Sequence, residues 1–301
     1  MIIKPRKKSI NHLVLELLHY RAVFSFQEQS QFENQVKGYE GEQRFDVFLD
    51  LLGQKGFVVN DLFLSSQNTH YQFDAIVVMN EQIIIYEVKN YAGRYSYEDG
   101  VLLSDAGYSI QDPVGQINRK KSYLHNFMRK NGYASNIQAY VVYINPDFYL
   151  YNLPPMDSII FLGQLERHFD DLAKTAHRVS LPNQKIAQTL VQHHNENYRP
   201  DNLPIYEFKN LKKGVLCKKC FSFDGENRRQ SRICNTCGYK EKTTDAIYRS
   251  VLEFQVLFPD NPVTMSAIHE WCKGVYSQRQ IRYLLNSKMK RCFKGPFTYY
   301  K

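Results

Sequence analysis

The stretch from Gln72 to Asn90, QFDAIVVMNEQIIIYEVKN, constrains the fold most, because it contains two consecutive runs of β-branched and aromatic residues. Such runs are typical of two strands joined by a tight turn, here at Asn80-Glu81. In this hairpin Asp74 faces Glu87 across the two strands. Because side chains alternate along a strand, Lys89 lies on the same face as Glu87. The sequence therefore predicts two carboxylates and one ammonium on one face of a hairpin.

The facing carboxylates predict a site for a divalent cation, Mg²⁺ or Mn²⁺. Carboxylates about 5 Å apart repel each other by roughly 1 kcal/mol in bulk water, and by more in a low-dielectric interior. Mg²⁺ offsets this repulsion, because it binds one or two carboxylates together with waters and phosphate oxygens. The alternative is a strand pair with solvated charges, in which Lys89 simply neutralises Glu87. The apolar residues around the charges favour the metal site, since buried charges are usually paired or bind metal.

Four short motifs together resemble the nuclease-related domain, NERD. They are GYEGE at 38–42, QFDAIVV around Asp74, YEVKN around Lys89 and DPVGQINRK around Gln116. NERD is a branch of the PD-(D/E)xK nuclease superfamily and is similar to the RecB-like and Mrr-like nucleases. The resemblance covers roughly residues 35–150. It implies a mixed sheet flanked by helices, as in restriction endonucleases, and metal-dependent hydrolysis of phosphodiester bonds.

The resemblance also implies a role for each motif residue. Asp74 and Glu87 would bind the catalytic metal ion, and Lys89 would be the catalytic lysine. Gln116 would be a positioning residue, and Glu42 an accessory acidic residue. Glu42 also suits the first turn of a helix for another reason, because the helix dipole alone favours a carboxylate there.

The remaining elements of this region predict an α/β fold with a mixed central sheet. Apolar residues at helical spacing predict helices over 10–24, 40–52, 113–131, 164–178 and 182–195. Apolar runs predict strands over 57–64, 137–144 and 158–162. The dipeptide Asp99-Gly100 predicts a hairpin of 93–97 and 101–104 that extends the sheet. Asp112 is expected to cap the helix that follows it. The basic residues on that helix either meet a phosphate backbone or form an ordinary solvated face: Arg119, Lys120 and Lys121.

Two cysteine pairs in the C-terminal third predict a structural Zn²⁺ site of the zinc-ribbon kind. The spacing is Cys217-x2-Cys220-x13-Cys234-x2-Cys237. Four thiolates complete a tetrahedral zinc shell and leave no open position for catalysis. Basic residues surround the knuckles and are expected to bind nucleic acid: Lys218, Lys219, Arg228, Arg229 and Arg232.

The last segment predicts a small helical domain that resembles a helix-turn-helix. Helices are expected over 246–258, 264–273 and 277–290, followed by a β wing over 291–300. Ser277 is expected to cap the third helix. That helix would enter the major groove of DNA with Gln278, Arg279 and Arg282 on its exposed start. Any three-helix bundle has similarly short turns, so a purely structural bundle stays the alternative.

Charge distribution indicates a polyanionic partner, with DNA as the expected one. Residues 1–204 contain 20 Lys and Arg against 22 Asp and Glu, whereas residues 205–301 contain 19 against 8. The basic excess therefore belongs to the C-terminal third. No apolar run approaches the length of a membrane span, and four of the six cysteines have metal-site spacing. We expect a cytoplasmic protein that does not bind membranes.

The sequence thus predicts five segments and one main function. The segments are an N-terminal helical arm (1–34), a NERD nuclease-like domain (35–198), a linker (199–213), a zinc ribbon (214–243) and a helix-turn-helix-like DNA-binding domain (244–301). The expected function is Mg²⁺-dependent cleavage of DNA. The main alternative is a non-catalytic regulator or replication-associated protein with an inactive nuclease core. An RNA-processing enzyme is a third possibility, because 14% of the residues are aromatic.

Overall fold

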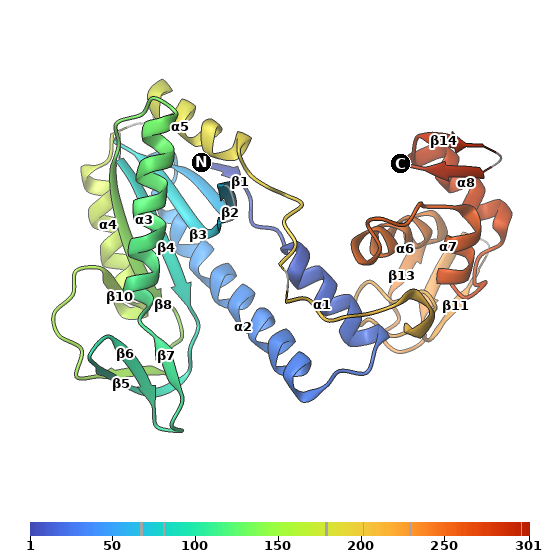
Figure 1. Ribbon diagram of the computed structural model, residues 1–301, viewed down its shortest axis with the longest axis horizontal. Coiled ribbons are helices and arrows are strands. Elements are labelled where there is room, and N and C mark those ends of the chain that lie inside the picture. Colours follow the sequence, from blue (N-terminus) through green and yellow to red (C-terminus); the bar gives the residue numbers. More distant parts are fainter. Residues whose placement is uncertain (67–68, 81, 178–179, 201, 229, 296) are drawn as a thin grey trace. The chain divides into compact units, whose positions relative to one another are not determined.

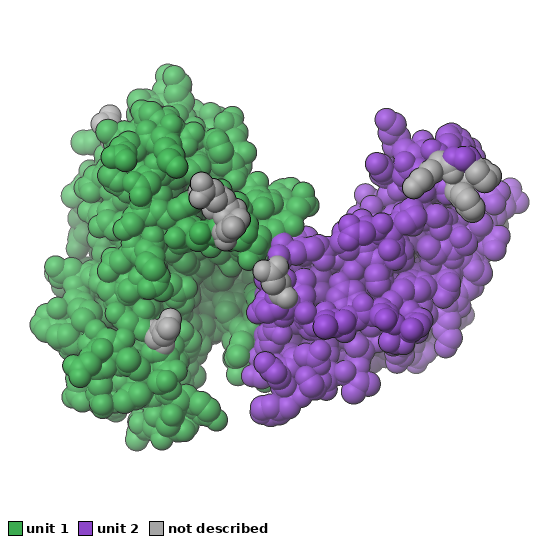
Figure 2. All heavy atoms as spheres, in the orientation of Figure 1, with its two compact units in different colours: residues 1–9, 33–198 green, residues 10–32, 199–301 purple. Residues whose placement is uncertain are grey.

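The computed structural model describes residues 1–66, 69–80, 82–177, 180–200, 202–228, 230–295 and 297–301. The chain divides into two units, which Figure 2 colours separately. Unit 1 contains residues 1–9 and 33–198, and unit 2 contains residues 10–32 and 199–301. Each unit has a hydrophobic core of its own. The chain therefore passes from one unit to the other after residues 9, 32 and 198.

A mixed sheet forms the centre of unit 1, which confirms the predicted fold class. Within the described residues it has six strands in the order β1-β2-β3-β4-β8-β10. The β1–β2, β4–β8 and β8–β10 pairs are parallel, and the two pairs between β2 and β4 are antiparallel. The strands are β1 (Ile2–Lys4), β2 (Phe57–Ser66), β3 (Thr69–Met79), β4 (Gln82–Lys89), β8 (Asn136–Tyr143) and β10 (Ile159–Phe161).

The central hairpin of β3 and β4 has the predicted register. Met79 pairs with Gln82, and the pairing continues to Ala75 opposite Tyr86. Asn80 begins the turn with a positive φ of 47°, and Glu81 of the predicted turn lies outside the described residues. Alternate residues of β3 enter different cores: Ile76 and Val78 face one core, whereas Ala75, Val77 and Met79 face the other. Both faces of the hairpin are therefore covered, as the apolar pattern predicts.

Helices cover the two faces of this sheet (Figure 1). One face packs against α3 (Pro113–Lys130) and α5 (Leu181–Gln192), and the other packs against α2 (Phe26–Leu49) and α4 (Leu165–Thr175). Short 3₁₀ turns follow α2 and precede α4, at Asp50–Leu52 and Leu162–Gln164. Asp112 caps α3 as predicted, because its carboxylate accepts hydrogen bonds from the backbone N–H groups of Val114 and Gly115.

The hairpin predicted to extend the central sheet belongs to a second sheet instead. Strands β5 (Gly93–Glu98) and β6 (Val101–Ser104) pair with each other as expected. Their further partners are β7 (Ser109–Gln111) and β9 (Phe148–Tyr151), in the order β7-β6-β5-β9. The prediction was wrong on this point because pairing within a hairpin is local, whereas the sheet that receives the hairpin depends on distant strands.

The helix predicted over 40–52 begins much earlier, at Phe26. Ser25 and Glu28 form a capping box at its start: the Glu28 carboxylate accepts from the Ser25 backbone N–H, and the Ser25 hydroxyl accepts from the Glu28 N–H. The predicted start was wrong because the first three turns of α2 are polar and show little apolar periodicity.

The N-terminal stretch 1–34 is not one arm in the structure. Residues 2–4 form β1 of the central sheet, whereas α1 (Ile10–Arg21) packs into the core of unit 2 through Val14, Leu17 and Leu18. The stretch 199–213, predicted as a linker, also belongs to unit 2. It contains a 3₁₀ turn at Phe208–Asn210, and Phe208 packs against the rings of Phe254, Phe258 and Trp271.

Among its described residues, the remainder of unit 2 consists of a small sheet, three helices and a hairpin. The sheet contains β11 (Gly225–Asn227), β12 (Ser231–Cys234) and β13 (Lys240–Lys242); the helices are α6 (Thr243–Leu257), α7 (Met265–Trp271) and α8 (Gln278–Lys288); the hairpin is β14 (Arg291–Lys294) with β15 (Phe297–Tyr300). Ser277 caps α8 as predicted. Ile281, Leu284 and Leu285 of α8 are buried, and Arg279 and Arg282 are exposed. Among the described residues, no helix combines the length and the apolar character that a membrane crossing requires.

Candidate functional site

Strands β2 and β3 share an irregularity at Asp61 and Asp74. Asn60 pairs with Ala75 and Leu62 pairs with Phe73, whereas Asp61 between them has a positive φ of 52°. A residue other than glycine rarely adopts this conformation. Such backbone strain is common at functional sites.

Asp74 is buried, and its carboxylate replaces a backbone carbonyl of β3 as the hydrogen-bond acceptor for β4. The pairing of β3 with β4 ends at Ala75 and Tyr86, and one Asp74 oxygen, Oδ2, accepts a hydrogen bond of 2.7 Å from the Val88 N–H. Burial, followed by the negative charge of Glu87, raises the pKa of Asp74 to about 6. The two carboxylates therefore interact, as the hairpin register predicts.

Glu87 lies between two ammonium groups. Its Oε1 accepts a hydrogen bond of 2.9 Å from Lys89 Nζ, and its Oε2 accepts one from Lys120 Nζ. Burial alone would raise the pKa of Glu87, but the two ammonium groups lower it below its ordinary value. In return, Glu87 raises the pKa of Lys89 although burial opposes this. Glu87 is thus ionised and Lys89 is protonated.

Gln116 comes from the first turn of α3 and accepts a hydrogen bond of 3.1 Å from Lys89 Nζ through its side-chain oxygen. Because Asp112 fixes the start of α3, the capped helix holds Gln116 in place beside Lys89. Asp74, Glu87, Gln116 and Lys120 line one open pocket of about 320 Å³, together with His70, Tyr71, Gln72 and Arg119. Residues from β3, β4 and α3 thus meet at one concave site.

Glu42 of α2 is held by Arg6, whose guanidinium lies 2.6 Å from Glu42 Oε2 and also binds Asp46. Burial and the Asp74 charge raise the pKa of Glu42 to about 8, although Arg6 opposes this. Glu42 is therefore electrostatically linked to Asp74, and Arg6 stabilises both Glu42 and Asp46.

Gly41, in the GYEGE motif, allows α2 to approach the end of β4. A Cβ atom at this position would lie 2.6 Å from Asn90 Cβ and 3.2 Å from Ile144 Cγ2. Asn90, the last residue of the YEVKN motif, donates a hydrogen bond of 2.7 Å to the Lys37 carbonyl of the same helix. Two of the motifs therefore dock α2 on the sheet and bring Glu42 to the site.

Sequence reasoning missed Lys120 and Arg6. Lys120 was expected on the exposed basic face of its helix, but it is buried against Glu87. Its position four residues after Gln116 places both on one face of α3, and this spacing is the signal that would have identified it. Arg6 offers no comparable signal, because its partners follow it by 36 and 40 residues.

The chemistry of the acidic pair suits a hard divalent cation, since Asp74 and Glu87 present carboxylate oxygens to one pocket. The pair by itself is an incomplete shell. Within the described part of the chain, only the four cysteines bring three or more His, Cys, Asp or Glu side chains close enough to share a metal ion. A cation at Asp74 and Glu87 would therefore need waters and substrate oxygens as further ligands.

The four predicted zinc ligands are gathered in unit 2. The Sγ atoms of Cys217, Cys220, Cys234 and Cys237 lie within 4.8 Å of one another. Cys217 and Cys237 are 3.6 Å apart, and Cys220 and Cys234 are 3.5 Å apart. Zn–S bonds of about 2.3 Å in a tetrahedron place sulfur atoms about 3.8 Å apart, so the four thiols fit a metal ion such as zinc.

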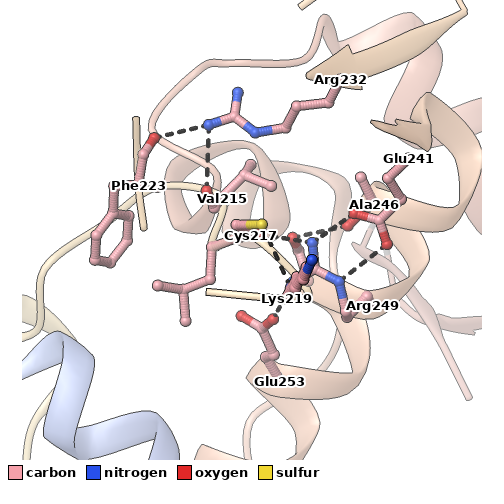
Figure 3. Close-up of polar contacts among 12 residues, drawn as sticks. Val215, Cys217, Lys219, Phe223, Arg232, Glu241, Ala246, Arg249 and Glu253 are labelled. Carbon is pink, nitrogen blue, oxygen red and sulfur yellow. Dashed lines mark hydrogen bonds and ion pairs between the residues drawn. The ribbon is translucent and has the colours of Figure 1, made fainter. Parts of the chain in front are cut away.

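Two arginines join the cysteine region to its surroundings (Figure 3). Arg232 was expected to bind DNA, but it is buried and donates to the carbonyls of Val215, Phe223 and Gly225. Arg249 of α6 donates to Glu241, Glu253 and the Leu216 carbonyl. Arg232 therefore stabilises the fold of this region, because its donors are paired with backbone carbonyls.

The other predicted DNA contacts have exposed side chains. They are Lys218, Lys219, Arg228, Gln278, Arg279 and Arg282. Arg228 also lies 3.6 Å from Glu226 on the surface. Arg229 lies outside the described residues.

Comparison with known proteins finds a family match within unit 1. Residues 37–144 match the nuclease-related domain, NERD, which confirms the resemblance drawn from the four motifs. No curated protein matches the chain. Among solved structures, the chain is similar to protein VC1899 from Vibrio cholerae, at 10% sequence identity and a TM-score of 0.26. The similarity covers 51% of this chain and 36% of that one.

Proposed function

Because this chain contains a nuclease-related domain at residues 37–144, we propose that it is a metal-dependent nuclease that hydrolyses DNA phosphodiester bonds. One observation carries the proposal: Asp74, Glu87 and Gln116 from β3, β4 and α3 line one pocket, and Lys89 donates hydrogen bonds to both Glu87 and Gln116. Carboxylates, an ammonium and an amide around a pocket are the groups that hydrolysis of a phosphodiester uses.

In this proposal Asp74 and Glu87 hold Mg²⁺ or Mn²⁺, which supplies positive charge and lowers the pKa of bound water. Lys89 is protonated and lies between Glu87 and Gln116, so it is positioned to donate to a phosphate oxygen or to orient a water. Gln116 keeps Lys89 in this orientation. Glu42 is an accessory acidic residue on α2, whose pKa burial and the Asp74 charge raise to about 8.

Unit 2 supplies DNA binding in the same proposal. Zn²⁺ bound by Cys217, Cys220, Cys234 and Cys237 stabilises the small sheet of β11, β12 and β13. Lys218 and Lys219 beside the first knuckle contact phosphates, and Arg279 and Arg282 on α8 reach the major groove. The excess of 19 basic over 8 acidic residues in 205–301 supports this assignment.

A DNA-binding regulator with an inactive nuclease core is the second candidate, and a specific observation favours it. Lys89 and Lys120 already neutralise Glu87, the carboxylate that would bind the metal. A cation entering the pocket therefore meets two positive charges. In this reading the basic surface of unit 2 carries the function and unit 1 serves as a scaffold.

Cleavage assays separate the two candidates. Circular and linear DNA, single- and double-stranded, together with matched RNA, are incubated with the full-length protein in Mg²⁺, Mn²⁺ or no added metal. The variants are Asp74→Asn, which can still accept the Val88 hydrogen bond, and Lys89→Met, which keeps the length of the side chain. Asp171→Asn on the exposed surface of α4 is the control.

A nuclease cuts DNA only with added metal, loses cutting in both pocket variants and keeps it in the control. Products from circular DNA would identify internal cleavage. Tight DNA binding without cutting in either metal would instead support the regulator. Cutting that survives both Asp74→Asn and Lys89→Met would show that the pocket is not the active site.

A further inference from the structure

We propose that unit 1 binds single-stranded DNA along the outer face of α3, in a track that starts at the Asp74–Glu87 pocket. This inference rests on the proposed function and adds the form of the substrate to it. Side chains at four-residue spacing on α3 define the track: Asn118, Ser122 and Asn126, with Tyr71 of β3 and Tyr123 beside them.

Three adjoining hollows form the track. The first is the pocket at Asp74 and Glu87. The second, of about 460 Å³, shares Tyr71 and Arg119 with the first. The third, of about 610 Å³, shares Asn118, Ser122 and Asn126 with the second. Neighbouring hollows share lining residues, so they adjoin one another from the acidic pair to α3, where the polar row forms the wall between the second and the third.

The polar side chains of the track lie in one row along the helix. Asn118, Ser122 and Asn126 are four residues apart, so they lie on one face and extend over about 12 Å. All three are exposed. Amide and hydroxyl groups both donate and accept hydrogen bonds, which suits the varied edges of nucleobases.

A pair of tyrosines provides a stacking surface in the second hollow. The rings of Tyr71 and Tyr123 are 4.2 Å apart between centroids, with 23° between their planes, and both side chains are partly exposed. A nucleobase can extend this stack, since every base has a flat aromatic face. Stacking on aromatic side chains is a main source of affinity for single strands.

The charge of this part of the chain suits a phosphate backbone. Residues 113–146 contain five Lys and Arg and no Asp or Glu, within a region, residues 1–204, whose acidic residues slightly outnumber the basic ones. Arg119 and Lys121 are exposed beside the row. A strand that follows the row is therefore attracted along its path and leads to the pocket.

These features favour a single strand over a duplex. In a duplex the bases are stacked on each other, so an aromatic ring cannot reach their faces and only their groove edges are accessible. The tyrosine pair and the amide row can be used together only by bases that are unpaired.

Photo-crosslinking tests the track in the full-length protein. Single-stranded and duplex oligonucleotides carry photoreactive thymine analogues, and the crosslinked peptides are identified by mass spectrometry. Ca²⁺ replaces Mg²⁺, because it also takes oxygen ligands, and chelators are left out because they would remove zinc from the cysteines. We expect single strands to crosslink to peptides containing residues 118–126, and duplexes to crosslink there at least tenfold less.

Two matched pairs of variants test the assigned contacts. Tyr123→Leu removes the ring but keeps an apolar side chain, and is expected to lower single-strand crosslinking at α3 about tenfold. Tyr123→Phe keeps the ring and should leave it unchanged. Arg119→Glu reverses a charge beside the row and should lower crosslinking, whereas Arg167→Glu on α4, at the opposite face of the sheet, should not.

Crosslinks confined to unit 2, or equal crosslinking of duplex and single strand at α3, would overturn the proposal. This readout does not require cleavage. If the protein crosslinks single strands at α3 but never cuts DNA, the track is supported and the nuclease activity is refuted. If it cuts DNA but does not crosslink at α3, the nuclease activity is supported and the track is refuted.

Discussion

The Lys120 ammonium of α3 lies against the Glu87 carboxylate, and both side chains are buried. A divalent cation bound at Glu87 would be repelled by this charge. A unit charge about 6 Å from a divalent ion contributes several kcal/mol at an effective dielectric constant of about 20. We therefore predict that Lys120→Met raises the affinity for Mg²⁺ at least tenfold in the absence of DNA, as measured by isothermal titration calorimetry.

Lys121→Met is the control for this prediction, because Lys121 is the exposed neighbour on the same helix. It should leave Mg²⁺ affinity nearly unchanged, since solvent screens its charge. Equal or weaker Mg²⁺ binding by Lys120→Met would mean that Lys120 orients Glu87 for the metal and does not compete with it.

Gly41→Ala is predicted to destabilise unit 1. The added Cβ would lie 2.6 Å from Asn90 Cβ, so α2 must move away from β4. Such overpacking typically costs about 1–3 kcal/mol of unfolding free energy. Gly38→Ala on the same helix has no neighbour within 4 Å of the new Cβ and should stabilise by up to about 1 kcal/mol. Urea unfolding measures both, and equal effects of the two would show that the close approach at Gly41 does not limit packing.

Zinc removal is predicted to unfold part of unit 2 and to abolish most DNA binding. The wild-type protein should contain about one Zn²⁺ per chain by elemental analysis, because four thiolates complete one tetrahedral shell. Cys220→Ser should lose the metal and lower the melting temperature. Cys292→Ser, which changes a cysteine outside the cluster, should retain the metal. Full zinc content in Cys220→Ser would contradict the assigned ligands.

Arg232 is predicted to contribute to stability, and Arg279 to DNA binding. Arg232→Ala leaves several buried carbonyls without their donor, so it should lower the unfolding free energy by about 1–3 kcal/mol. Arg279→Ala should leave stability unchanged and weaken DNA binding. The slope of log affinity against log salt concentration should also fall by about 1 if Arg279 contacts a phosphate. If Arg279→Ala has the wild-type affinity for DNA and the wild-type salt dependence, Arg279 on α8 does not contact DNA.

The central hairpin was predictable because its information is local. The β-branched runs fix β3 and β4, and the two-residue turn at Asn80 fixes the register that places Asp74 near Glu87. The capping residues Asp112 and Ser277 likewise act within three residues of their own helices. The cysteine cluster follows from spacing in the same way.

Contacts between distant segments were not predictable from these patterns. Arg6 binds Glu42 across 36 residues, and β5 of the 93–104 hairpin pairs with β9, for example Gly93 with Phe148, 55 residues later. A lysine on a basic helix face is usually solvated, so only its spacing of four residues from Gln116 distinguished Lys120 from its neighbours. Arg232 similarly lies among basic residues in the sequence, but its side chain is buried in the structure.

The assignment of α1 to unit 2 has a consequence for synthesis on the ribosome. Arg21 of α1 binds Glu253 of α6 at 2.6 Å and stacks over Trp271, so this helix needs partners that are made more than 200 residues later. At about 5–20 residues per second, these partners emerge roughly 10–50 seconds after α1. During this interval the nascent chain can complete unit 1, while the apolar face of α1, with Val14, Leu17 and Leu18, stays without its native partners in unit 2.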